Sequence, residues 1–472
     1  MNSLKLQKVT VALFCITAVC LVFGYSLYRQ QMIGFGLIIA APLVVLFSSK
    51  PQWLFIFMLT VFFSGLRVPL LFADFNMFTL TALLFVAIGT ADRLTRKDRS
   101  QISKVQFITI CLFLLNLMII IAFRGAGFRI LGDGNWGGMR YVFIILSMLV
   151  YLNSNFVSLT AKQLKIVIFI SLLFGLLPFL AESLFIFTNG AVTIHYLFFE
   201  FAGSTAMNIQ ETLGRSGGVG RLQTGQLAGE CLVLLGLGYL IPQKKYALLG
   251  LLYIVGIILV SMSGHRIGLI KLSFITWIYF AFSFRKKIVA YLLISGIIAA
   301  VFTGLLYLVS PILPLAAQRM ISFLPGIKID PIAQISAFGT TQWRLTLWYD
   351  ALKEIPEYLI LGKGYTFPAD TNFNLGLEGL TESVRMWAIQ TSAYHNGIFS
   401  LLIGMGISGL LIGGFLLGSL AYRYYSFMMK DWDDELIKSV YKVIYCVLLV
   451  TTAFFFTIYG DTFVSIPRIL YL

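Results

Sequence analysis

The sequence predicts an all-α polytopic membrane protein, a bundle of about 12–14 transmembrane helices with a large loop on the outer, periplasmic face. The composition is the first observation behind this prediction. The 472 residues are 59% hydrophobic and only 12% charged, and the mean hydropathy is +0.89. Soluble domains, by contrast, are about half apolar and about a quarter charged. The second observation is that apolar runs long enough to cross a bilayer recur along the whole chain.

These apolar runs mark the expected spans. They cover residues 9–28, 32–49, 53–72, 77–91, 105–123, 141–156, 165–188, 222–241, 246–263, 267–284, 288–310, 396–422 and 443–460. The first run lacks a small-residue cleavage site, so we interpret it as a retained span. The tail after Gly460 is expected to form a short or partial span. Residues 1–472 are therefore expected to form a single integral-membrane domain.

Charge and cysteine usage agree with this class. The net charge of +15 is ordinary for a membrane protein with basic loops, so no nucleic-acid partner is expected; the expected surroundings are membrane lipids. The five cysteines all fall in apolar runs, which indicates small core residues rather than a disulfide framework.

The basic loops predict the orientation. The short loops 92–104 and 284–287 are rich in lysine and arginine, and such loops stay on the cytoplasmic side. The long polar connections 188–221 and 311–394 then lie on the outer face of the membrane. The second is the large outer loop, expected to carry part of a site and a helix over 341–354.

Arginine and lysine divide between the two faces in this topology. Lysine dominates the inner face, as the orientation rule alone predicts, whereas arginine dominates the outer face. Arginine stays charged, and its planar guanidinium binds phosphate through two parallel hydrogen bonds. An outward-facing pocket for an anionic, phosphate-bearing ligand is therefore expected. The alternative is that these arginines contact lipid headgroups and make ion pairs within the loops.

His395 is the candidate general base. It is one of three histidines in the chain, and it stands where a polar loop gives way to the apolar run 396–422. The dipole at a helix N-terminus disfavours the charged imidazolium, and a general base must be neutral. Asn396 would orient the ring or bind a substrate hydroxyl. The alternative is that His395 only caps the helix at the membrane surface.

Three arginines next to apolar runs are candidates for phosphate binding. Arg266 lies in a turn between two spans, where an arginine is costly unless it is paired or serves a ligand. Arg215 and Arg221 lie among glycines just before the run at 222–241, and N–H groups at a helix start can hold phosphate. The alternative for Arg266 is snorkelling to the membrane surface. The glycine-rich stretch lacks the ending of a nucleotide-binding P-loop, so no nucleotide cofactor is expected.

The outer connection offers an arginine and two tryptophans. Arg344 and Trp348 stand one helical turn apart, and Trp343 precedes them. Arg344 and Trp348 together would bind a sugar or pack on the membrane surface. No outer cluster of histidine, cysteine and carboxylate side chains has the spacing of a metal site, so no metal or other cofactor is expected.

The histidine motif resembles a known family. His395-Asn396 is followed after nine residues by Gly406 and after two more by Gly409. This pattern is similar to the signature of bacterial O-antigen ligases. The related O-antigen and exopolysaccharide polymerases are similar in this region. Upstream, Arg344 and Trp348 resemble the Arg-x3-Trp segment of this superfamily of membrane glycosyltransferases.

Further motifs of the superfamily appear in the same order. Gly362 and Gly364 resemble its Gly-x-Gly, and residues 261–269 resemble its Ser-x-Ser-Arg turn, with His265 inserted. Residues 214–230 resemble its arginine-bearing approach to a span, with Gln223-Thr224 in place of Pro-Asn. The resemblance covers residues 210–420.

The resemblance implies a chemistry and a set of roles. The donor would be a glycan linked to undecaprenyl diphosphate, and the acceptor a hydroxyl of lipid A–core or of another lipid-linked glycan. Transfer would take place on the outer face of the bacterial inner membrane, without a metal. His395, Arg266 and Arg215 are the implied catalytic residues. The implied substrate-binding residues are Arg221, Arg344, Asn396 and Trp348.

Two other functions stay open. Ligase-type transfer to lipid A–core is the predicted reaction, and polymerase-type extension of a lipid-linked glycan is the first alternative. A polysaccharide or lipid transporter (a flippase) is the second, because Glu182 and Glu230 lie within apolar runs and suit ion coupling. Against a transporter, the basic residues gather on one face and no repeated halves are evident.

Overall fold

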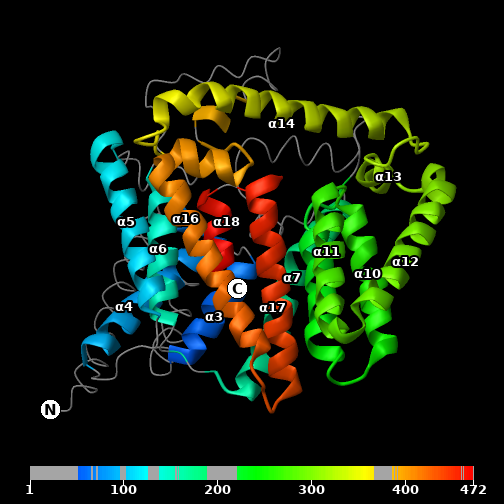
Figure 1. Cartoon of the computed structure of the whole chain (residues 1–472), viewed down its shortest axis with the longest axis horizontal. Helices are drawn as coiled ribbons and strands as arrows, with labels where there is room; N and C mark the ends of the chain where they lie inside the picture. Colours follow the sequence, from blue (N-terminus) through cyan, green and yellow to red (C-terminus); the bar gives the residue numbers. More distant parts are fainter. Residues whose placement is uncertain are drawn as a thin grey trace.

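A computed structural model of the chain gives the fold (Figure 1). It describes residues 51–64, 67–70, 73–95, 103–125, 138–154, 157, 159–188, 221–365, 385–386, 388–390, 392–458, 460 and 462–470. The expected spans 9–28 and 32–49 and the candidate residue Arg215 lie outside the described residues.

Helices dominate the first part of the described chain. They are α3 (Pro51–Ser64), α4 (Met77–Thr95), α5 (Lys104–Arg124), α6 (Met139–Ser154) and α7 (Ala161–Phe187). Two short strands, β1 (Arg67–Leu70) and β2 (Ala73–Asn76), pair antiparallel between α3 and α4.

Helices also make up the second part. They are α9 (Gly225–Leu235), which continues into the π-helical turn η2 (Gly236–Leu240), α10 (Tyr246–Met262), α11 (Arg266–Ser283), α12 (Ile288–Val309), α13 (Leu315–Ile321), α14 (Pro331–Tyr358), α16 (Gly397–Met429), α17 (Glu435–Thr457) and α18 (Thr462–Leu470). Short 3-10 turns, η3 (Arg285–Lys287) and η4 (Ser310–Ile312), flank α12.

The described helices confirm the predicted class of an all-α, multi-pass membrane protein. Six helical segments are long and apolar enough to span a bilayer: Lys104–Arg124, Ala161–Phe187, Arg266–Ser283, Arg285–Ile312, Gly397–Met429 and Glu435–Thr457. Shorter apolar helices of 10–17 residues accompany them, among them Arg140–Ser154 and Tyr246–Met262. The count of about 12–14 spans stays a prediction.

The expected span 53–72 is wrong in its second half. The helix α3 ends at Ser64, and residues 67–70 form β1, in which Arg67 pairs with Asn76 of β2. Pro69 explains part of the difference, because proline has no N–H to continue a helical hydrogen-bond ladder. Apolar composition alone does not register this interruption.

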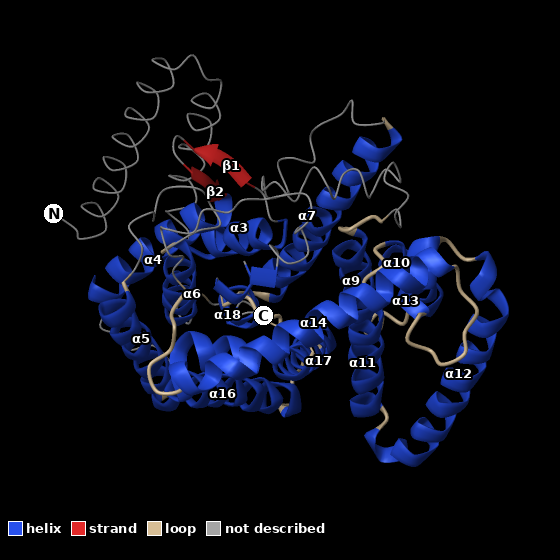
Figure 2. Ribbon diagram, turned by 90° about the horizontal axis from the view of Figure 1, so that it is seen from above, coloured by secondary structure: helices blue, strands red, loops and turns tan. Residues whose placement is uncertain are grey.

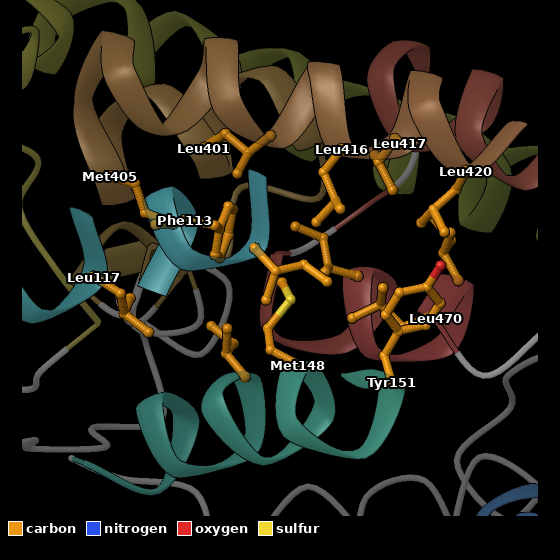
Figure 3. Close-up of a cluster of buried hydrophobic side chains, with 14 of the residues drawn as sticks. Phe113, Leu117, Met148, Tyr151, Leu401, Met405, Leu416, Leu417, Leu420 and Leu470 are labelled. Atoms are coloured by element: carbon orange, nitrogen blue, oxygen red, sulfur yellow. The ribbon is translucent and has the colours of Figure 1, made fainter. Parts of the chain in front are cut away.

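The largest apolar core joins α5, α6, α16 and α18. Phe113 and Leu117 of α5 meet Met148 of α6, with Leu401 and Leu416 of α16 closing the cluster, and all five are fully buried (Figure 3). Burying a large apolar side chain is worth about 1.5–3 kcal/mol in water, whereas within a bilayer close packing supplies most of the gain. This core fixes the position of α16, whose first residue, Gly397, follows the candidate base His395 by two positions.

The helix α14 lies crosswise over one end of the bundle (Figure 1). Seen from that end, it runs from beside α13 and α11 to above α17 and α16 (Figure 2). Pro331 begins it after the N-cap Asp330, whose carboxylate accepts the N–H of Ile332 at 2.8 Å. The expected helix 341–354 is therefore part of a helix twice as long, 28 residues in all.

The motif residues and the basic short loops lie at different ends of the bundle. The turn between α10 and α11, the start of α16 and the whole of α14 lie at one end, which we call the α14 end. Connectivity then places Lys244 and Lys245, before α10, and Arg285–Lys287, after α11, at the opposite end. The motif residues and the basic short loops are thus on opposite ends.

Candidate functional site

A break in α16 builds the support of the site. Gly406 has φ 74° and ψ −178°, a conformation that side chains other than glycine rarely adopt. A Cβ there would overlap the carbonyl oxygen of Ile360, just beyond α14. Across this close approach, Lys363 N–H donates to the Ile403 carbonyl at 2.6 Å, and Ile407 N–H donates to the Leu359 carbonyl at 2.7 Å.

Asn116 of α5 completes the break. Its Nδ2 donates to the Met405 carbonyl at 3.2 Å, and its Oδ1 accepts the hydroxyl of Ser408 at 2.9 Å. A backbone carbonyl freed inside a membrane helix needs such a partner, since lipid offers none. The glycines of the two motifs therefore act in packing: they bring the segment after α14 against α16.

The turn before α16 holds His395 in an unusual backbone conformation. His395 has φ 51°, and Ser392 has φ 54°. Neighbouring bonds hold this turn: the Trp348 indole N–H donates to the Tyr394 carbonyl at 2.9 Å, and the Ser392 hydroxyl donates to the Gly364 carbonyl at 3.0 Å. Backbone strain of this kind concentrates at functional sites, where the surrounding structure must enforce it.

Asn396 is the N-cap of α16. Its Oδ1 accepts the N–H groups of Ile398 at 3.0 Å and Phe399 at 3.4 Å, and its Nδ2 donates to the Thr457 carbonyl at 3.4 Å. The capping role considered for His395 therefore belongs to its neighbour. His395 stands one residue outside the helix.

Trp343 and Tyr394 flank the histidine. The rings of Trp343 and His395 have centroids 5.6 Å apart and are inclined at 49°. The Tyr394 hydroxyl donates to the carboxylate of Glu354, which also pairs with Lys363 Nζ at 2.9 Å. Burial and the Glu354 charge both raise the pKa of Tyr394, so this phenol stays protonated and serves as a fixed donor.

The second half of the site is a group of four arginines, Arg221, Arg266, Arg319 and Arg344, which we call the arginine cluster. It surrounds the turn between α10 and α11, where Gly264 has φ 65°. The side chain of Arg221 lies against Gly264, so closely that a Cβ there would overlap it. The predicted two-helix turn is confirmed.

Arg319 and Arg266 join this turn to α14. Arg319 is buried, and it donates to the Gly264 carbonyl at 2.7 Å, to Ser336 Oγ at 3.0 Å and to Thr340 Oγ1 at 2.9 Å. Arg266 Nη2 donates to the Ala337 carbonyl and the Thr341 hydroxyl, at 3.0 and 2.8 Å. Within the described part of the chain, Arg266 has no carboxylate partner.

His265 lies inside the arginine cluster. Burial lowers its pKa to about 4, and the charges of Arg221, Arg319 and Arg344 act in the same direction. A histidine that is neutral at physiological pH adds no charge of its own. The local field is therefore that of the arginines, and it favours an anion.

The start of α9 is already occupied by a carboxylate. Glu182 of α7 is buried and accepts the N–H groups of Gln223 and Thr224, both at 2.9 Å, together with the Thr224 hydroxyl. The expectation that this glycine-rich segment presents N–H groups to phosphate is therefore wrong for these two groups. Among its described residues, the segment contributes the side chain of Arg221 to the arginine cluster.

Glu230 also has structural partners. It pairs with Lys271 of α11 at 2.8 Å and accepts the Gln226 amide at 2.8 Å. Both intramembrane carboxylates considered for ion coupling therefore have structural partners. Glu182 connects α7 to the start of α9, and Glu230 connects α9 to α11.

The structure thus gathers most of the predicted residues at one end. Trp343 lies against His395, and the next residue, Arg344, acts on His265. Trp348 contacts the turn before α16 through its indole N–H rather than presenting that group to solvent. Sequence reasoning missed Arg319; its signal was an arginine in a short apolar segment.

The fold defines a multi-pass membrane protein with an arginine-rich polar site at one end of its helix bundle. Residues 249–413 match the family described as O-antigen ligase, a domain that O-antigen ligases and O-antigen polymerases share. Residues 249–413 therefore form a domain of the O-antigen ligase type, which occurs in enzymes of the glycosyltransferase type. No curated protein matches the chain. The matched range contains the α10–α11 turn, α14 and His395, whereas Arg221 and Glu182 precede it.

Proposed function

We propose that the protein transfers a glycan from an undecaprenyl-diphosphate-linked donor to a hydroxyl of lipid A–core, on the outer face of the inner membrane. One observation carries this proposal: of two consecutive residues of α14, Trp343 contacts the ring of the candidate base, and Arg344, a member of the arginine cluster, acts electrostatically on His265 and Arg266. A glycosyl transfer from a diphosphate needs these two features side by side. The family match supports glycan transfer of the ligase or polymerase type.

In this proposal the arginine cluster receives the diphosphate. Arg266 has only neutral oxygens as hydrogen-bond partners among the described residues, so a phosphate oxygen can replace them. Arg221, in the segment before α9, and Arg344, in α14, add further positive charge. These guanidinium groups would stabilise the charge that develops on the leaving diphosphate. No metal takes part.

His395 is the proposed general base. The acceptor hydroxyl gives its proton to the imidazole while its oxygen bonds to the anomeric carbon, and the bond from that carbon to the diphosphate breaks. A single displacement of this kind inverts the anomeric centre. Trp343, against the histidine ring, is the candidate platform for the sugar next to the reacting bond.

The acceptor separates ligase from polymerase. Purified protein in proteoliposomes receives the lipid-linked donor with either lipid A–core or a second lipid-linked glycan, and the product is identified by mass spectrometry. We expect glycosylated lipid A–core. A longer lipid-linked glycan would make the protein a polymerase, and donor movement without any new glycosidic bond would make it a transporter.

The phosphate role of the arginine cluster has its own test in the same assay. Arg266→Lys keeps the charge but loses the planar fork, so the donor KM should rise and remain raised. Arg285→Lys, at the opposite end of the bundle, is the matched control and should behave as wild type. A wild-type donor KM in Arg266→Lys would reduce Arg266 to a membrane-surface anchor.

A further inference from the structure

The side chain of Glu182 connects α7 to the segment before α9. Glu182 lies near the C-terminal end of α7, is 6% exposed, and precedes the family-matched range 249–413. Its two carboxylate oxygens accept three donors from two consecutive residues, Gln223 and Thr224. An intramembrane carboxylate with this many protein partners holds a segment in place rather than waiting for an ion.

The segment it holds begins with Arg221. Leu222 N–H donates to the Met262 carbonyl of α10 at 3.0 Å. The segment 222–224 is thus hydrogen-bonded to α10 through Leu222 and to α7 through Gln223 and Thr224. With both fastenings in place, the Arg221 side chain lies along Gly264 in the α10–α11 turn. The path of the chain through residues 222–224 therefore sets where the Arg221 side chain passes the α10–α11 turn.

The residue pair at 223–224 has the donor groups that Glu182 requires. A proline at 223 would have no N–H for Glu182 to accept, and Thr224 supplies a hydroxyl that donates to the same carboxylate. The carboxylate and this residue pair match each other chemically.

We propose that Glu182 is a positioning residue for Arg221: it clamps residues 223–224 and so aims Arg221 at the donor diphosphate. This rests on the proposed function for the role of Arg221 as a donor contact. The placement itself rests only on the contacts of α7, α9 and α10. Glu182 takes no part in the bond changes.

Steady-state kinetics test the proposal. Glu182→Gln loses at least one of the three acceptor bonds, so the donor KM should rise about 10-fold to 100-fold, as a misplaced binding group predicts, with the acceptor KM unchanged. Thr224→Val, which removes only the hydroxyl bond, should show a smaller rise. In an Arg221→Ala background, Glu182→Gln should add nothing further, because it acts through the arginine.

A cross-link tests the placement without any activity. In a cysteine-free background, cysteines at Leu222 and Met262 should be joined by a short bifunctional thiol reagent, since their backbones are hydrogen-bonded, and Glu182→Gln should lower the yield of this cross-link. Thr160→Ala is the control: it removes the capping box at the other end of α7 and should leave both the cross-link and the donor KM unchanged.

The outcomes separate the two claims. An unchanged cross-link in Glu182→Gln overturns the positioning role whatever the kinetics show. Additive donor KM effects of Glu182→Gln and Arg221→Ala also overturn it. A wild-type donor KM in Arg221→Ala would instead overturn the proposed donor contact, while a lowered cross-link yield would still support the clamp.

Discussion

The indole N–H of Trp348 donates to the carbonyl of Tyr394 at 2.9 Å, across 46 positions of sequence. This bond fixes the turn in which His395 takes its positive φ, and so α14 sets the position of the candidate base. The same helix receives Arg266 and Arg319 through its neutral oxygens. One element lying across the bundle thereby aligns both halves of the site.

Trp348→Phe isolates this bond. The ring remains and one hydrogen bond, worth about 0.5–1.5 kcal/mol, is lost. Because the lost bond orients His395, turnover should fall about 10-fold, as misplacement of a catalytic group predicts. Trp432→Phe removes the same kind of bond, 2.8 Å to the Phe427 carbonyl, at the opposite end of the bundle. Equal turnover in the two variants would show that the Trp348 bond only stabilises the protein.

Gly406→Ala tests the break in α16. Alanine at φ 74° and ψ −178° costs about 1–3 kcal/mol in backbone strain, and its Cβ would also overlap the Ile360 carbonyl. We expect a lower melting temperature in detergent and a loss of transfer activity. Gly414→Ala lies in the same helix with nothing near its Cβ, and it should be close to neutral in both measurements. Similar melting temperatures for the two variants would contradict the account of the break.

His265 predicts a pH dependence of stability. Its pKa is lowered to about 4 in the folded protein, whereas the unfolded chain has the ordinary value near 6.5. Between these values the unfolded state binds more protons, so stability is lost as the pH falls from about 6.5 to about 4. In His265→Gln, the apparent melting temperature should fall less over this window than in wild type. Parallel curves would mean that His265 does not titrate in this way.

The proposed orientation predicts which of two lysine positions, once replaced by cysteine, can be labelled from the periplasmic side. Lys353 of α14 is 60% exposed at the α14 end, and Lys286 is exposed at the opposite end. In a cysteine-free background, a cysteine in place of Lys353 should react with an impermeant thiol reagent reaching the periplasm. One in place of Lys286 should react only after the inner membrane is permeabilised. The reverse pattern would place the α14 end in the cytoplasm.

The sequence predicts the positions of spans well where hydropathy alone determines them. The expected span 246–263 corresponds to Tyr246–Met262, and 288–310 corresponds to Ile288–Val309. Prediction of a span from hydropathy fails where the chain makes contacts with a segment that is distant in sequence. The break at Gly406 depends on Leu359 and Asn116, which are far away in sequence, so the run 396–422 looks like an uninterrupted helix.

The candidate site shows the same division. Residue types and motif order predict His395, Arg266 and Arg344 as members of one site, because their chemistry is recognisable in isolation. Their neighbours are not predictable in this way. Glu182 looks like an ion-coupling carboxylate in the sequence, and only the fold brings it to Gln223 and Thr224. The positive φ of His395 likewise depends on contacts with α14 and Gly364.

The most direct test of the account is the turnover of His395→Gln in proteoliposomes with donor and acceptor supplied. A general base contributes about 10²–10⁴-fold in rate, and glutamine keeps hydrogen-bonding capacity but cannot take the proton. We predict a loss of this size in both His395→Gln and His395→Ala, with normal insertion and unchanged donor binding. A His395→Gln enzyme with near wild-type turnover would contradict the assignment of His395 as the base.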